Sequence, residues 1–249
     1  ALNGEAMVVN DGSISVSSPY AVAYGALVRG LYAGVVNNGD ITASGVNAFG
    51  AYVDGYYAAV ENSGSIEAIS SGGGIAVGAY AYGYGSASIV NSGDIHASAT
   101  DGTAIGVLAV AVGEVFIDNS GTISATDPDT ELAVVMNSLT GATLVNSGDI
   151  HGAVLSGDSD DLVANESGGT WHVGNFASYL GGGDDTISNA SGGVIHLANG
   201  GIFLGGADTS NAFQNAGLLQ VSGYGLVHMG SADSVLAHDG MVSLVDGGA

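Results

Sequence analysis

Short apolar bursts alternate with polar residues along this chain, and a five-residue phrase, Asn-x-Gly-x-Ile, recurs between them. Six clear copies of the phrase begin at Asn10, Asn37, Asn62, Asn91, Asn119 and Asn146. Subtraction of successive positions gives spacings of 27, 25, 29, 28 and 27 residues. Looser copies begin at Asn165, Asn189, Asn215 and Asp239. A period in this range is typical of a solenoid, in which each coil buries its apolar side chains by stacking on the next coil.

Three apolar segments lie within each period. One precedes the Asn, as in Ile89-Val90, a second follows the Gly, as in Ile95-His96-Ala97, and a third lies further on, as in residues 104–110. None of them has the 3.6-residue apolar spacing of a helix, and the repeat is rich in Gly and β-branched residues. The pattern therefore predicts an all-β fold, a three-sided parallel β-helix. About ten coils at the strand spacing of ~4.8 Å would form a rod of roughly 48 Å.

The Asn and Gly of the phrase are expected to form a bend, because both tolerate the left-handed backbone conformation. Asn side chains stacked at the strand spacing can also donate and accept hydrogen bonds along the axis. The Ile that follows is expected to point inward and stack with its equivalents. The predicted structural ladder consists of Asn37, Asn62, Asn91, Asn119, Asn146, Asn189 and Asn215.

The repeat changes in character after residue 150. Asp127 to Glu131, which includes one of the two Pro residues, is expected to loop out between coils. Residues 1–150 carry the strict phrase, whereas residues 151–249 carry shorter Gly- and Asp-rich coils whose closing residues, Asp161, Asp185, Asp208 and Asp233, are spaced by 24, 23 and 25. Since the repeat is continuous, we expect residues 1–249 to form one elongated body, a segment of a longer protein.

The charge of the chain restricts its partners. Asp and Glu number 24 against a single basic residue, Arg29, for a formal net charge of −23. Such a field repels nucleic acid and anionic membranes, so we expect no nucleic-acid partner. The longest apolar stretch is too short to span a bilayer, so no direct membrane insertion is expected. Cys is absent, which excludes disulfides and thiolate metal sites.

Tyrosines are concentrated in the first coils, where nine of the eleven precede residue 85. Tyr24, Tyr52 and Tyr80 recur every 28 residues, and each follows an Ala. This spacing predicts similar positions on successive coils. Two interpretations stay open: an aromatic column that covers one sheet, or an exposed strip that binds sugar rings or a partner surface.

Candidate chemistry is sparse. Gly181-x-Gly183-x-Asp185-x-Ile187 matches a calcium-binding nonapeptide, but it occurs once per coil rather than in tandem, so the structural interpretation, with Gly in the bend and Asp capping its own turn, is favoured. Neighbouring Asp residues on a strand point to opposite faces and do not form a catalytic pair. The histidines, which we do not expect to bind zinc, are His96, His151, His172, His196, His228 and His238. We therefore expect no catalytic residue, no metal site and no cofactor.

Alternation of Asn-Ser-Gly-x-Ile with Leu-Gly-x-Gly-x-Asp-x-Ile resembles the passenger domains of bacterial type V autotransporters and related surface adhesins. The resemblance is one of repeat style and extends from Val9 to Val242. It implies a right-handed β-helix that is exported across the outer membrane of a Gram-negative bacterium and displayed or released outside. The family's export signal and membrane barrel would lie outside such a passenger fragment.

The leading hypothesis is a non-enzymatic extracellular adhesin, or the stalk of one, that promotes surface attachment, self-association or biofilm formation. Its expected partner is a host surface, a glycan ligand or a second copy of the chain. One alternative is a carbohydrate-active enzyme with Asp161, Asp185 or Glu114 in a cleft. Another alternative is a passive spacer of a larger surface protein.

Overall fold

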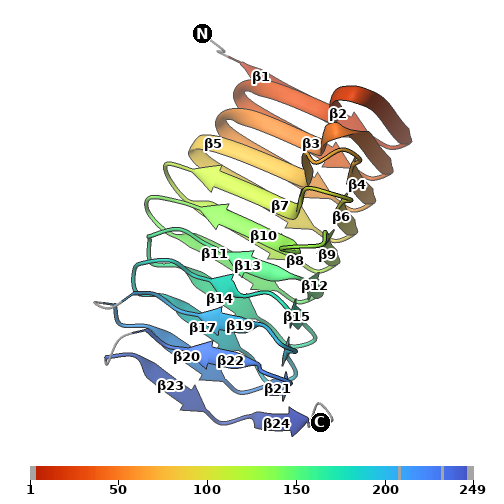
Figure 1. The fold of residues 1–249 in the computed structure, drawn as a ribbon. Helices are drawn as coiled ribbons and strands as arrows, with labels where there is room; N and C mark the ends of the chain where they lie inside the picture. Colours follow the sequence, from red (N-terminus) through yellow and green to blue (C-terminus); the bar gives the residue numbers. More distant parts are fainter. Residues whose placement is uncertain (1–3, 207–208, 231–232, 246–249) are drawn as a thin grey trace.

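A computed structural model of the protein describes residues 4–206, 209–230 and 233–245. These residues contain 24 strands and no helix, and all the strands belong to one parallel sheet. The sheet winds into a stack of coils, a β-solenoid of about nine turns, with its N-terminal and C-terminal coils at opposite ends (Figure 1). The predicted parallel β-helix is confirmed, with about one turn fewer than the ten expected.

Each coil has three sides, because every third strand segment pairs with its equivalent on the next coil. The first coils are nearly continuous, so that β2 (Ser13–Asn37), β3 (Asp40–Asn62) and β5 (Ile75–Asn91) each run over more than one side. The strands that lead into the repeated Asn position are β1 (Glu5–Asn10), β8 (Val115–Asn119), β11 (Ala142–Asn146), β14 (Leu162–Asn165), β17 (Thr186–Asn189), β20 (Ala212–Asn215) and β23 (Val235–His238).

The strands that follow the Asn-Gly bend form the second side. They are β4 (Ser65–Ser70), β6 (Asp94–Ala99), β9 (Thr122–Thr126), β12 (Asp149–His151), β15 (Thr170–Gly174), β18 (Val194–Leu197), β21 (Leu218–Ser222) and β24 (Met241–Val245). The third side consists of β7 (Thr103–Ala111), β10 (Leu132–Asn137), β13 (Ala153–Leu155), β16 (Ser178–Tyr179), β19 (Gly201–Phe203) and β22 (Leu226–His228).

The core is a set of aliphatic columns that run along the axis. The Ile of the phrase stacks in register from Ile41 through Ile66, and each of these side chains is 0% exposed. Further down the same column, Trp171 pairs with Ile150 on one side and Ile195 on the other. Inward residues alternate with outward ones along each strand, as the period-two pattern predicts. Stacked β-branched side chains thus bury the apolar surface that one coil could not bury alone.

Glycine at one position of the third side allows a close approach to the Ile column and to the next coil. A Cβ at Gly78 would lie 2.6 Å from Cγ2 of Ile95 and 2.6 Å from the carbonyl oxygen of Gly106. Gly25, Gly50 and Gly106 meet the Ile column in the same way. A second core cluster lies beyond this contact, and all of its buried members are Ala. The close approach of two sides requires a residue without a side chain here.

The coils shorten where the sequence changes. Asn146 and Asn165 are adjacent ladder residues only 19 positions apart. Asp127 to Glu131 forms a loop as predicted, but it joins β9 and β10, two sides of one coil, and Asp127 is buried there and accepts from the N–H of Ala104. Asp161 stacks on Asp185 as its spacing predicts, but the next equivalent is Asn211, 26 residues further on, rather than Asp208, which lies outside the described residues.

Candidate functional site

The repeated Asn side chains form one hydrogen-bonded ladder inside the solenoid. The Nδ2 of each Asn donates to the Oδ1 of the next, for example over 2.8 Å from Asn91 to Asn119 and 2.8 Å from Asn119 to Asn146. The same Nδ2 also donates to the carbonyl oxygen of the Gly two residues on, as from Asn119 to Gly121 over 3.1 Å. These amides are buried and fully paired, which gives them a structural role and makes them inaccessible to a ligand.

The ladder is longer than the seven residues predicted from the sequence. Asn10 donates to Asn37 at one end, and Asn165 links Asn146 to Asn189. At the other end, Nδ2 of Asn215 lies 3.1 Å from Nδ1 of His238, whose ring nitrogen replaces the amide oxygen as acceptor. The sequence carried a signal for Asn165, because its looser copy has the same two extra residues before the second Gly as the copy at Asn189, which the predicted ladder includes.

Tyr24, Tyr52 and Tyr80 meet, although not in the way their spacing predicts. Tyr52 pairs with Tyr80 in register, with ring centroids 4.8 Å apart. Tyr24 instead pairs with Phe49, three residues before Tyr52, so the expectation of one shared position was wrong for Tyr24. Its ring still reaches Tyr52, at 5.5 Å between centroids. The reason is a register shift between Ser18 and Val22, which displaces the following residues relative to the next coil.

This first aromatic cluster covers the sheet more than it presents rings to solvent. All three tyrosines are half-buried, and burial together with the nearby Tyr52 raises the pKa of Tyr80 to about 12. The guanidinium of Arg29 lies 5.7 Å from the Tyr52 ring centroid and 3.3 Å from a carboxylate oxygen of Asp54. The chain's one cation is thus held by an aromatic ring and an acid.

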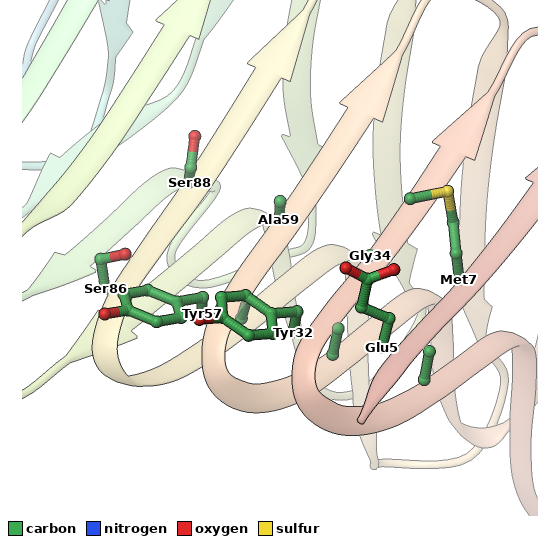
Figure 2. A pocket seen from close by; sticks show the side chains of 11 residues that line it. Glu5, Met7, Tyr32, Gly34, Tyr57, Ala59, Ser86 and Ser88 are labelled. Atoms are coloured by element: carbon green, nitrogen blue, oxygen red, sulfur yellow. The ribbon is translucent and has the colours of Figure 1, made fainter. Parts of the chain in front are cut away.

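A second pair of tyrosines is more exposed and borders a groove. Tyr32 and Tyr57 stack in register with ring centroids 5.0 Å apart and planes 14° apart, and their exposed fractions are 51% and 43%. They line an open cavity of about 600 Å³ together with side chains from β1, β2, β3 and β5. Figure 2 shows the two rings along one margin, with Glu5 and Met7 of β1 at one end. We call this cavity the N-terminal groove.

Counting from the ladder would have identified this pair. Tyr32 lies five residues before Asn37 and Tyr57 lies five residues before Asn62, so both have the same position in the coil. Counting from one Tyr to the next does not predict which residues pair, because insertions at the corners give the coils different lengths. Residues just before each ladder Asn are in register again. The ladder Asn is therefore the better origin for any prediction of stacked side chains.

The Asp residues of the shorter coils form a second buried ladder. Asp161 is 2% exposed and its Oδ1 accepts from the N–H of Ala142 at 2.7 Å, while its Oδ2 accepts from the hydroxyl of Ser156 at 2.6 Å. Asp185 accepts in turn from the N–H of Asp161 at 3.1 Å. The expected capping of the Asp's own turn by backbone amides was wrong here, because the side chain reaches the backbone of the preceding coil instead.

Asp185 is the one member of this ladder with an unmatched oxygen. It is 0% exposed, and its Oδ2 is the only buried side-chain N or O atom without a hydrogen-bond partner in the described part of the chain. Burial, with the charges of Asp161, Asp160 and Asp184, raises its pKa to about 7, against the opposing hydrogen bond from the Asp161 N–H. The side chain at the Ser156 position of this coil is Leu180, which has no hydroxyl to donate.

The histidines of the second side are aligned along the axis. His151 and His172 stack with centroids 4.7 Å apart, and His196 meets His172 edge-on at 5.6 Å. Burial and the two neighbouring imidazoles lower the pKa of His172. His96 lies nearer the N-terminal end of the same row, where its Nδ1 is 2.8 Å from the Ser124 hydroxyl. His228 lies on the third side, where its ring is tilted against that of Phe203. Within the described ranges, no group of three or more acidic or His side chains is arranged to hold a metal ion.

The described residues also contain no helix that could cross a membrane. The geometry therefore offers two kinds of feature: buried polar ladders that hold the coils together, and one aromatic groove on the outer surface of the first coils. Comparison with known proteins adds no identity to this geometry, since no family model, no curated protein and no solved structure matches the chain.

Proposed function

We propose that this chain is a non-enzymatic extracellular adhesin or the stalk of one, exported by a Gram-negative bacterium. The observation that carries the proposal is the pair of half-exposed tyrosines, Tyr32 and Tyr57, beside the N-terminal groove. Aromatic rings exposed on a rigid scaffold are typical of surfaces that contact a partner, because they contribute large contact area at low entropic cost. The style of the repeat, which resembles autotransporter passengers, supports the same assignment.

The scaffold suits attachment over a distance. Its coils share continuous buried ladders and columns, so that the outer surface is a set of rows with one residue per coil. Repeated rows can make many weak contacts with a second repeated surface, including another copy of the chain. The net charge of −23 opposes contact between copies, so self-association should strengthen with salt or divalent cations.

The enzyme alternative lacks an accessible pair of acids among its candidates. Asp161 and Asp185 are 2% and 0% exposed, so neither carboxyl group faces a polysaccharide. Glu114 is exposed, and lies in the turn between β7 and β8. A glycoside hydrolase needs two carboxyl groups on either side of the scissile bond. This burial favours the adhesive role over hydrolysis by these residues.

Attachment of protein-coated beads tests the proposal. Fluorescent beads carrying the chain should be retained under flow on epithelial cells, and beads carrying the Tyr32→Ser/Tyr57→Ser double variant should be retained less. Tyr179→Ser is the matched control, because Tyr179 is 51% exposed and stacks on Phe203 in a similar way on the third side. Retention no better than that of uncoated beads would contradict attachment to this surface.

Sedimentation velocity tests the self-associating form of the proposal. We expect dimers or larger species to increase with ionic strength or with millimolar calcium. An unchanged elongated monomer under every condition, combined with no bead retention, would contradict the adhesive role and leave a passive spacer.

A further inference from the structure

The N-terminal groove has a definite shape in the register of the sheet. Its floor is a row of small residues on three successive coils, Gly34, Ala59 and Ser88. Larger apolar side chains occupy the same row on either side, with Met7 at one end and Phe116 at the other. Four strand spacings separate these two residues, a distance of about 19 Å. An extended peptide of about six residues has this length.

The two margins of the groove combine apolar and acidic side chains. One margin is the row of Glu5, Tyr32, Tyr57 and Ser86, which Figure 2 shows beside the floor. The row beyond the opposite edge, two residues further along each strand, contains apolar residues and two acidic ones. Its members are Val9, Val36, Glu61, Val90 and Asp118. Glu5 and Glu61 are exposed, and neither has a basic neighbour, because Arg29 is the only Lys or Arg of the chain and pairs with Asp54.

The chain itself shows how such a surface holds a cation. The guanidinium of Arg29 lies over the ring of Tyr52 and beside the carboxylate of Asp54. The groove offers the same two kinds of group, exposed tyrosine rings and carboxylates, without a cation of its own. Arginine is attracted to aromatic rings and to carboxylates at once, and its apolar stem can pack on small residues.

We propose that the N-terminal groove binds an extended cationic peptide segment of a partner protein, in which Arg or Lys alternates with apolar residues. The proposal rests on the adhesive role and names the chemistry of the ligand. Apolar side chains of the peptide lie along the floor of Gly34, Ala59 and Ser88, while the long cationic side chains on its other face fold over the margin to meet Tyr32, Tyr57 and Glu5. The charge of −23 accelerates the approach of such a partner and disfavours anionic glycans.

Fluorescence polarisation with a defined peptide tests the proposal. The probe is fluorescein-labelled Arg-Val-Arg-Val-Arg-Val, with Arg-Ser-Arg-Ser-Arg-Ser and Glu-Val-Glu-Val-Glu-Val as comparison peptides. At 150 mM salt we expect the first peptide to bind more tightly than the second, and no binding of the third. Tyr32→Ser/Tyr57→Ser should weaken binding about tenfold, because two cation–ring contacts are lost.

The control variants separate the groove from the general negative charge. Tyr179→Ser leaves the net charge unchanged and should alter affinity less than about twofold, within the spread expected of an exposed position away from the site. Ala59→Phe fills the floor of the groove and leaves both tyrosines in place. It should abolish the preference for the Arg-Val peptide over the Arg-Ser peptide. Circular dichroism of each variant checks that the strands are retained.

Two outcomes would overturn the proposal. Equal loss in the groove variant and in Tyr179→Ser would show that binding is not specific to the groove, and no loss in either would show that the peptide responds to net charge alone. Binding of a neutral oligosaccharide such as maltotriose at the groove, with no binding of the Arg-Val peptide, would assign a different ligand class. Bead retention that depends on Tyr32 and Tyr57 would survive either result, so failure of this ligand assignment is distinguishable from failure of the adhesive role.

Discussion

Replacement of Asp185 by Asn should stabilise the protein at neutral pH and do little in acid. In the native structure Oδ2 of Asp185 is buried without a hydrogen-bond partner, and the pKa of the carboxyl group is raised from 3.8 to about 7. An amide has no charge to bury. It also fits the ladder, because Asn211 occupies the equivalent position one coil on, where its Nδ2 donates to the carbonyl oxygens of Leu204 and Met229 at 3.1 Å each.

The sign of the pH dependence follows from the raised pKa. The unfolded carboxyl group ionises near pH 4, whereas the folded one stays protonated up to about pH 7, so the native protein loses stability as the pH rises between these values. A shift of about 3 units corresponds to at most about 4 kcal/mol, at about 1.4 kcal/mol per unit. Asp185→Asn should therefore raise the free energy of unfolding by up to about 4 kcal/mol at pH 8. At pH 4 the gain should be no more than about 1 kcal/mol, the worth of one hydrogen bond.

Urea unfolding at pH 4 and pH 8 measures this difference. The single Trp of the chain, Trp171, is 1% exposed and lies in the coils next to the Asp ladder, so its fluorescence reports unfolding locally, with circular dichroism as the global probe. Asp158→Asn is the control, because it removes a nearby but exposed charge and should show no comparable pH dependence. An equal stability change at both pH values, or destabilisation at pH 8, would refute the buried-acid argument.

Three further predictions concern the Asn ladder, the close contact at Gly78 and the His row. Asn119→Ala should lower the free energy of unfolding by about 2–4 kcal/mol, because both ladder neighbours lose a buried partner. Ser120→Ala, at an exposed position, is the control and should change it by less than about 0.5 kcal/mol in the same urea titration. Gly78→Ala should lower the free energy of unfolding by about 1–3 kcal/mol through overpacking. Gly34→Ala is the control, because its Cβ would meet nothing nearer than 3.8 Å, and equal melting temperatures of the two variants would contradict the prediction. Because the pKa of His172 is lowered, the native state resists its protonation and loses stability as the pH falls below about 6.5. His172→Gln should therefore reduce the loss of stability in acid. An NMR titration that gives the His172 imidazole a pKa above its ordinary value would contradict this prediction.

The repeat by itself determined the architecture. Every coil places its Asn, Gly and Ile in the same environment, so the same contacts recur along the axis, and a local phrase such as Asn91-Ser92-Gly93-Asp94-Ile95 specifies both a bend and a stacked column. We also predicted from the sequence that neighbouring Asp residues would point to opposite faces, and Asp160 is exposed whereas Asp161 is buried.

Only the tertiary structure decided which side chains meet across coils of unequal length. Corner loops add or remove residues between one ladder Asn and the next, so equal spacing in the sequence did not place Tyr24 in register with Tyr52, and the exposed pair proved to be Tyr32 and Tyr57. The unmatched oxygen of Asp185 also follows from the stacking, since Leu180 occupies the position at which Ser156, one coil earlier, donates its hydroxyl to Asp161. The register between coils is set by how they stack, so spacing in the sequence predicts it only when it is counted from the ladder Asn of each coil.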